Sequence, residues 1–142
     1  MDVIMHIDGG ARGNPGPAGV GVVVQTADNG TYLFRKGFFL GTATNNVAEY
    51  TGLLRGLDLL ATLELNGKVT VVSDSELMVK QINGEYRVKA GNLKPLYQQA
   101  TAKLRGLPSW EMTHTRRENN KLADELANRA MDAAADVDLD DE

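Results

Sequence analysis

The sequence has no cysteine and only two histidines, so several kinds of chemistry are excluded at once. Without cysteine there is no disulfide framework, no thiol nucleophile and no cysteine-ligated zinc site. With two histidines, a zinc site would have few ligands. The longest apolar runs are about six residues, far short of the roughly 18 that a membrane-spanning helix needs, and residues 1–8 lack a basic start or a cleavage-like segment. We therefore expect a cytoplasmic protein with no membrane partner.

The 142 residues suffice for one domain that buries about two thirds of its unfolded surface. The net charge of −4 is unevenly distributed. Residues 1–131 hold all 15 basic residues and 13 of the 19 acidic ones, a net +2, whereas residues 132–142 hold the other six acids, a net −6. The composition predicts a main domain at 1–131 and an acidic, disordered tail at 132–142. The alternative is an acidic strip that competes with phosphates for a basic surface.

The spacing of apolar residues predicts an α/β domain without internal repeats. Runs at 3–8, 18–25 and 31–40 are separated by a glycine-rich turn and by an Asn-Gly hairpin signal, which favours an antiparallel meander. Apolar positions three and four residues apart predict a helix at 47–63, and the strand at 68–73 then implies a right-handed parallel crossover. The remaining elements are expected as helices at 76–82, 93–106 and 119–131 and a strand at 109–115.

Four acidic residues stand in four different local contexts. Asp8 ends the first apolar run and Asp74 directly follows the strand at 68–73, while Glu49 lies in the first turn of one helix and Asp124 lies in the last helix. Ligands of open α/β sheets gather at the carboxyl ends of strands, and both helices can close on that edge. Because Mg²⁺ prefers oxygen ligands, the pattern indicates a hard-metal site and phosphoryl chemistry.

Each acid also has a plain structural interpretation. Asp8, which precedes a glycine, can organise its own turn. Glu49 follows Asn46 by three residues, as in a capping box with Asn46 as the N-cap. Asp74 can cap the helix after it, unless Ser75 does so. The fourth acid can belong to a solvated helix face. No single acid therefore establishes a metal site.

Four segments in order, IDGGARGNPGPAG, TNNVAEYTGLLRGL, VVSDSELMVKQINGEY and HTRRENNKLADELANRA, resemble the type 1 ribonuclease H family over residues 1–131. The resemblance implies an RNase H-like α/β fold: a mixed five-stranded sheet, antiparallel in its first three strands and flanked by helices. It also implies that four acids are catalytic and hold two Mg²⁺ ions, with Mn²⁺ able to substitute. These acids are Asp8, Glu49, Asp74 and Asp124.

The resemblance implies roles for further residues. His114, ten residues before Asp124, matches a mobile catalytic histidine that can donate a proton to the leaving 3′-oxygen or assist product release. The alternative for His114 is a strand residue half-covered by the last helix. His6 is expected to be a sheet residue without a role. Substrate contacts are implied for Asn14, Thr44, Asn45, Asn46, Arg117 and Asn120.

The motifs predict an endonuclease that hydrolyses the RNA strand of RNA–DNA hybrids to 5′-phosphate and 3′-hydroxyl ends by a two-metal mechanism. The hybrid duplex is the expected partner, read through the 2′-hydroxyls of one strand. A monomer without an obligate protein partner is expected. The alternatives are a related nuclease of the same fold that acts on double-stranded RNA or DNA, and a non-catalytic hybrid-binding module.

One region departs from the family pattern. Some relatives carry a large basic protrusion after the helix that follows the third acid, whereas the corresponding connection here is short. It offers a few cationic side chains for phosphates, so weaker and more salt-sensitive binding is expected. These residues are Lys80, Arg87, Lys89 and Lys94, together with Tyr86.

Overall fold

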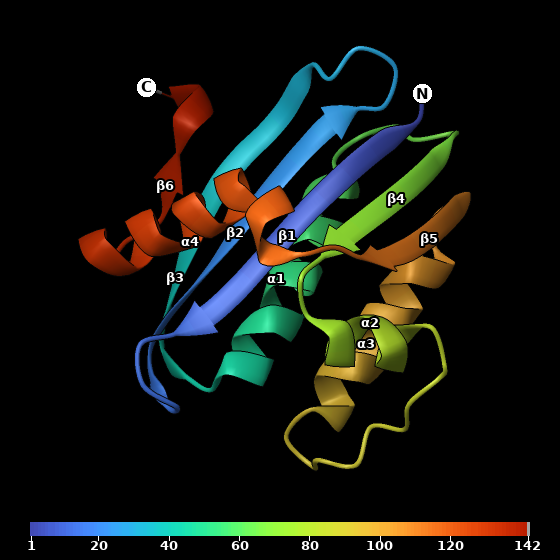
Figure 1. Cartoon of the computed structure of the whole chain (residues 1–142). Coiled ribbons are helices and arrows are strands. Elements are labelled where there is room, and N and C mark those ends of the chain that lie inside the picture. Colours follow the sequence, from blue (N-terminus) through green and yellow to red (C-terminus); the bar gives the residue numbers. More distant parts are fainter. Residues whose placement is uncertain (142) are drawn as a thin grey trace.

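The computed structural model describes residues 1–141 and contains one mixed sheet in the order β5-β4-β1-β2-β3-β6 (Figure 1). The strands are β1 (Val3–Ala11), β2 (Gly16–Thr26), β3 (Tyr32–Ala43), β4 (Lys68–Ser73), β5 (Ser109–His114) and β6 (Val137–Asp138). The α-helices are α1 (Asn45–Leu60), α2 (Glu76–Ile82), α3 (Lys94–Arg105) and α4 (Lys121–Ala133), and short 3-10 helices span Arg117–Asn119 and Leu139–Asp141. The α/β fold is as expected, with one strand more than predicted.

The first three strands form the expected antiparallel meander, and β1 continues beyond its predicted end. It pairs with β2 as far as Ala11 opposite Ala18. Its parallel pairing with β4 stops earlier, at Ile7 opposite Ser73. Asp8 therefore lies within β1 and not at its end, at the point where the strand loses one neighbour and keeps the other.

The two faces of the sheet are covered differently. Figure 1 shows α1 and α3 behind the sheet and α4 across its front. Val3, Met5 and Ile7 are buried in the larger core between the sheet and α1 and α3. Because side chains alternate along a strand, the residues between and after them, including His6 and Asp8, face α4. The smaller core beneath α4 contains Val23, Ala123 and Leu126.

Three glycines form a floor on which α4 rests. Gly19 and Gly21 of β2 and Gly37 of β3 face the helix backbone, and a Cβ atom on any of them would lie closer than 3.0 Å to a carbonyl oxygen of α4. Gly21 is opposite Gly37 in one pairing and opposite Asp8 in the other. The absence of side chains on this glycine floor lets the helix approach the sheet closely beside Asp8.

The disordered tail expected at 132–142 is not found over residues 132–141, which complete α4 and then form β6 and a short 3-10 helix, while residue 142 lies outside the described residues. After α4 the chain turns back and β6 pairs antiparallel with β3, which adds a sixth strand at that edge. Asp138 forms an ion pair with Lys36, and Asp140 forms one with Arg35 at 2.9 Å. Composition alone predicted disorder because the acids lack partners nearby in sequence. The partners of Asp138 and Asp140 come from β3 instead.

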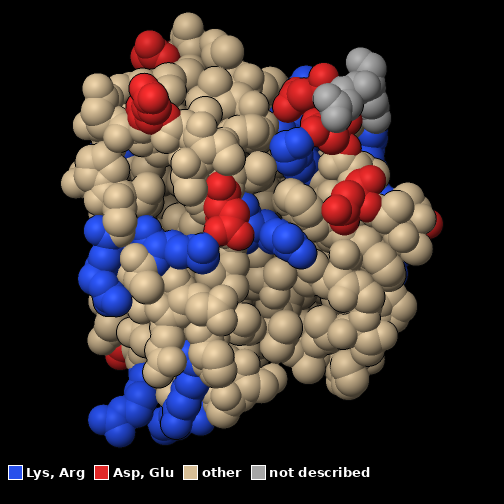
Figure 2. Space-filling model, turned by 180° about the vertical axis from the view of Figure 1, so that it is seen from behind, with Lys and Arg blue, Asp and Glu red and all other residues tan. Residues whose placement is uncertain are grey.

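None of the helices within residues 1–141 has the length and apolar character needed to cross a membrane. Figure 2 shows the back of the molecule, where basic side chains occur in separate groups, some of them next to acidic ones. On this face the mild positive charge of residues 1–131 is therefore not gathered into one broad basic strip.

Candidate active site

Two of the four acids lie where β1 and β4 separate. The parallel pairing ends at Ile7 opposite Ser73, and Asp8 and Asp74 are the next residues on the two strands. β4 then turns into α2, whose N-cap is Ser75, with a side-chain oxygen that accepts a backbone N–H of the helix at 3.2 Å. Asp74 is therefore not needed as the cap, and its carboxylate lies beside that of Asp8.

Asp124 reaches the same place from the other side of the chain. It lies in the first turn of α4, which the glycine floor holds close to β1 and β2. The backbone carbonyl of Ala123, the residue before Asp124, is the atom that faces Gly21. Asp124 is half-buried, and its carboxyl group is near enough to that of Asp8 to raise the pKa of Asp8. It therefore does not belong to a solvated helix face.

Asp8 is the electrostatic centre of the cluster. It is 9% exposed, and burial raises its pKa from 3.8 to about 8, with further contributions from Asp74 and Asp124. Burial disfavours the ionised form, and the two neighbouring carboxylates repel a third negative charge. Three acids that are far apart in sequence thus lie close together, and their repulsion adds to the effect of burial on Asp8.

The start of α1 settles the structural alternative for Glu49. Thr44 is the N-cap, and its hydroxyl accepts the N–H of Val47 at 3.2 Å. Asn46 therefore lies inside the helix and is not the N-cap, so the capping box that was the structural alternative for Glu49 does not form. The carboxylate of Glu49 is not used to cap α1 and can face the other acids.

Glu49 is also a perturbed acid. Burial raises its pKa from 4.5 to about 7. A hydrogen bond with Ser75 opposes the increase, Asp74 adds to it, and Arg117 opposes it. Ser75 thus contacts both the start of α2 and an acid of the cluster. The sequence indicated only its capping role.

The donor set suits a hard divalent cation. Asp8, Glu49, Asp74 and Asp124 offer carboxylate oxygens, which Mg²⁺ prefers, and a bound cation would offset the repulsion among them. Within residues 1–141, no three His, Asp or Glu side chains have the mutual spacing of a ready-made metal site. The chemistry of the four residues fits an ion, and its binding would draw the side chains together.

Arg117, and not His114, is the residue placed against the carboxylates. Its Nε lies 3.6 Å from Asp74 Oδ2, and its side chain is 81% exposed. His114 is exposed at the end of β5, opposite Ser73. The pKa of nearby Glu76 is lowered by its hydrogen bond with Lys80 and, to a smaller extent, by His114. His114 thus lies at the neighbouring strand end and is not half-covered by α4.

Four of the predicted substrate residues gather where the glycine-rich turn meets α1. The backbone N–H of Asn45 donates to Asn14 Oδ1 at 3.1 Å, and Asn45 Oδ1 accepts the N–H of Ala11 at 2.8 Å. These bonds fasten the turn to the helix start, where Thr44 is the cap. Asn14, Asn45 and Asn46 are all exposed, so their remaining polar atoms face solvent.

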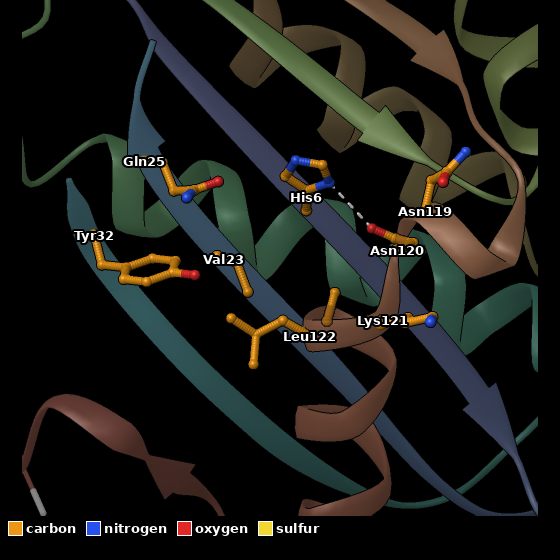
Figure 3. Close-up of a pocket in the computed structure, with 9 residues that line it drawn as sticks. His6, Val23, Gln25, Tyr32, Asn119, Asn120, Lys121 and Leu122 are labelled. Carbon is orange, nitrogen blue, oxygen red and sulfur yellow. Dashed lines mark hydrogen bonds between the residues drawn. The ribbon is translucent and has the colours of Figure 1, made fainter. Parts of the chain in front are cut away.

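Asn120 is placed differently from the other predicted substrate residues (Figure 3). It is 2% exposed, its Nδ2 donates to the Ile7 carbonyl at 2.8 Å, and its Oδ1 lies 3.2 Å from His6 Nδ1. The structure therefore does not bring Asn120 to the surface. The side chain instead ties the start of α4 to β1 next to Asp8, and His6, expected to have no role, is its partner.

A groove of about 290 Å³ lies beside Asp8 and Asp124, between the glycine-rich turn and α4. Asp8, Asp124 and Asn45 line it, together with two basic residues, Arg12 and Arg117. Sequence reasoning did not single out Arg12. The available signal was that Arg12 is the one charged residue between Gly9 and Pro17.

Known proteins resemble this chain in sequence and in fold. A model of the reverse transcriptase-like family matches residues 6–130. The bifunctional protein Rv2228c of Mycobacterium tuberculosis is 47% identical over 135 residues, which are 95% of this chain and 37% of that protein. Its solved N-terminal RNase H domain has a TM-score of 0.89, covering 94% of this chain and 95% of that one. The fold and the site define an RNase H-like domain.

Two further relatives narrow the class. Ribonuclease H of Ruegeria pomeroyi is 32% identical, and the match covers 92% of this chain and 92% of that protein. LC11-RNase H1, solved in complex with an RNA/DNA hybrid, is 43% identical with a TM-score of 0.87, covering 93% of this chain and 98% of that one. The chain belongs to the ribonuclease H family. It nevertheless spans little more than a third of Rv2228c, 37% of its length.

Proposed function

We propose that this chain is a metal-dependent endonuclease that hydrolyses the RNA strand of RNA–DNA hybrids to 5′-phosphate and 3′-hydroxyl ends. The observation that carries the proposal is the convergence of Asp8, Asp74 and Asp124 on one buried position, where the pKa of Asp8 is raised to about 8. Repulsion among these carboxylates opposes folding, so the presence of the cluster favours a role in binding a cation. The hybrid complex of LC11-RNase H1 supports the same substrate here.

The four carboxylates would hold two Mg²⁺ ions, which Mn²⁺ can replace. When bound, the ions supply positive charge that acidifies the attacking water and stabilises the leaving oxygen. In the hydrolysis, the water releases one proton to the solvent and its oxygen bonds to phosphorus, the bond from phosphorus to the 3′-oxygen breaks, and that 3′-oxygen takes up a proton. Arg117 would offset charge on the phosphate, and the exposed imidazole of His114 would supply or relay the proton.

Selection of a hybrid would depend on the turn at the start of α1. Asn14, Asn45 and Asn46 present amides that can both donate to and accept from 2′-hydroxyls without fixing the base sequence. Thr44 lies at a helix N-terminus, which favours a phosphate. A second groove, of about 570 Å³, is lined by Tyr86, Arg87 and other residues of the short basic connection and would hold further backbone phosphates.

Cleavage assays on matched duplexes test this function. The chain is incubated with Mg²⁺ and end-labelled RNA–DNA hybrid, double-stranded RNA or double-stranded DNA of the same sequence. We expect rapid cleavage of the RNA strand in the hybrid alone. Asp8→Asn should lower the rate at least about a thousandfold while hybrid binding persists, because this change removes a charge from the metal site. Asp58→Asn, an exposed acid paired with Lys103 at 2.7 Å, is the matched control.

The same assays separate the alternatives. Preferred cleavage of either homoduplex would assign the fold to a different nuclease. Binding of the hybrid without hydrolysis in Mg²⁺ or Mn²⁺ would indicate a non-catalytic binding module. Turnover by Asp8→Asn at the rate of Asp58→Asn would contradict the metal site itself.

A further inference from the structure

Arg12 connects the glycine-rich turn to the last turn of α4. Its Nη1 lies 2.7 Å from Asp132 Oδ1. Its Nη2 donates to the backbone oxygen of Asn128 at 3.4 Å and to Asn128 Oδ1 at 3.2 Å. The amide of Asn128 donates in turn to the backbone oxygen of Asp124 at 3.0 Å. The guanidinium therefore uses its two ends differently, one toward a carboxylate and one toward the helix that bears Asp124.

The position of Arg12 is set by the backbone around it. The N–H of Arg12 donates to the Pro17 carbonyl at 2.8 Å, which closes the turn. Gly16 packs against the Arg12 carbonyl so closely that a Cβ atom there would overlap it. The start of the side chain is thus fixed, and only its outer part can change partner. Arg12 also lines the groove beside Asp8 and Asp124, so its charged end lies beside the path expected for a phosphodiester backbone.

The ion pair with Asp132 is easily exchanged. The side chains of Arg12 and Asp132 are 46% and 67% exposed, and exposed pairs contribute little to stability. Asp132 also lies in the last turn of α4, which contains no basic residue. A negative charge is unfavourable at that end of a helix. A phosphate oxygen offers the guanidinium the same charge and hydrogen-bonding geometry as the carboxylate.

We propose that Arg12 is an anchor for a backbone phosphate of the hybrid and that Asp132 is its internal competitor. The phosphate replaces Asp132 at Nη1, while Asn128 continues to hold Nη2 and keeps the guanidinium over the groove. Arg12 and Arg117 then contact the backbone at two positions in the groove that Asp8 and Asp124 line. This inference rests on the proposed function, because it names a contact of the same substrate.

Binding measurements without hydrolysis test the anchor. A labelled RNA–DNA hybrid is titrated with the full chain in EDTA, and fluorescence anisotropy is recorded between about 50 and 200 mM salt. The variants are Arg12→Ala, Asp132→Asn and the double variant. The Lys103–Asp58 pair provides matched controls, since its 2.7 Å distance is the same, its side chains are similarly exposed at 41% and 56%, and it lies away from the groove lining. Lys103→Ala changes the net charge by the same amount as Arg12→Ala, and Asp58→Asn by the same amount as Asp132→Asn.

We expect Arg12→Ala to weaken binding roughly three- to tenfold and to reduce the slope of log affinity against log salt by about one, whereas Lys103→Ala does neither. Asp132→Asn should tighten binding roughly two- to fivefold more than Asp58→Asn. When Arg12 is already replaced by alanine, Asp132→Asn should no longer tighten binding of the hybrid. Thermal unfolding of each variant checks that the fold is retained.

Two failures are distinguishable. If the wild-type chain cleaves the hybrid in Mg²⁺ but Arg12→Ala binds it like Lys103→Ala, the anchor is overturned and the proposed function stands. A gain from Asp132→Asn that persists without Arg12 would overturn the competition. If the wild-type chain neither binds nor cleaves the hybrid, the proposed function fails and the anchor fails with it.

Discussion

Asp8 is a residue whose ionisation opposes folding. Its pKa rises from 3.8 to about 8 through burial, Asp74 and Asp124, so the folded state binds the proton more tightly than the unfolded state does. The penalty is absent below about pH 4, grows as the pH rises, and is complete above about pH 8. The metal-free protein should therefore lose stability across this range, and Mg²⁺ should restore it.

Asp8→Asn tests this linkage because it removes the charge and nearly preserves the shape. Thermal unfolding in EDTA should show that the variant is more stable than the wild type, and the difference should widen from about pH 5 to about pH 8. One pKa unit corresponds to about 1.4 kcal/mol, so a widening of at least about 1 kcal/mol, a few degrees in Tm, is expected. A constant difference across this range would contradict the raised pKa.

The alanine variants of Arg117 and His114 test which of these two side chains contributes more to cleavage. Because Arg117 contacts Asp74 and His114 lies beside Glu76, Arg117→Ala should slow single-turnover cleavage more than His114→Ala does, by roughly tenfold or more. Arg117 also opposes the burial-driven rise in the pKa of Glu49, so its loss should move the acidic limb of the pH–rate profile upward. A larger loss on replacing His114 would favour that residue as the proton donor.

Among the secondary-structure elements, α4 depends most on close backbone contact. The glycine floor sets its height above the sheet, and Gly21 lies both opposite Asp8 and beneath Ala123. Gly21→Ala should lift the start of the helix and move Asp124 away from Asp8. We expect kcat to fall at least about tenfold with little change in hybrid affinity, because the turn at α1 is untouched.

The same substitution has a matched control in Gly91→Ala. A Cβ atom on Gly91 meets nothing within 4 Å, so both Tm and kcat should stay near wild type. A second measurement distinguishes a misplaced Asp124 from a general loss of stability. If Asp124 has moved away from Asp8, the stability of the metal-free Gly21→Ala variant should decrease less with rising pH than that of the wild type. Wild-type kcat in Gly21→Ala would contradict the role of the floor.

The sequence predicted elements well wherever the signal was local. Apolar runs identify β1, β2 and β3, and helical spacing identifies α1. Predictions that depended on distant neighbours were less complete. Thr44 rather than Asn46 caps α1. Several adjacent residues are polar, and which of them becomes the cap depends on where the chain leaves β3. The burial of Asn120 depends on β1 and could not be read from its own helix.

At the scale of the whole molecule, the acidic segment offsets part of the positive charge of residues 1–131. Arg12, Arg35 and Lys36 each form an ion pair with an aspartate from residues 132–140. The composition suggested either a solvated tail or a strip over a basic surface, and the structure places most of the segment against β3 instead. The acids that contact Arg35 and Lys36 therefore support the fold, while Asp132 alone among these three pairs with a residue that lines the groove.

Removing residues 134–142 should separate stability from activity. The truncation deletes β6 and uncovers the edge of β3, so we expect a loss of about 1–2 kcal/mol in the free energy of unfolding and more self-association. Cleavage of the hybrid should change less than twofold, because Arg12, Asp132 and the four acids all remain. Denaturant unfolding, light scattering and single-turnover rates provide the three measurements.

The pH dependence of that loss identifies its source. A hydrogen bond with Lys36 lowers the pKa of Asp138 below 3.8, so this contribution is present above the unfolded pKa and disappears as the pH falls through the folded one. The stability difference between the full and truncated chains should therefore shrink as the pH falls below about 4. Asp138→Asn in the full chain should reproduce the part that shrinks, while strand pairing and the burial of Val137 and Leu139 account for the rest. A difference that does not change with pH would assign the whole effect to strand pairing.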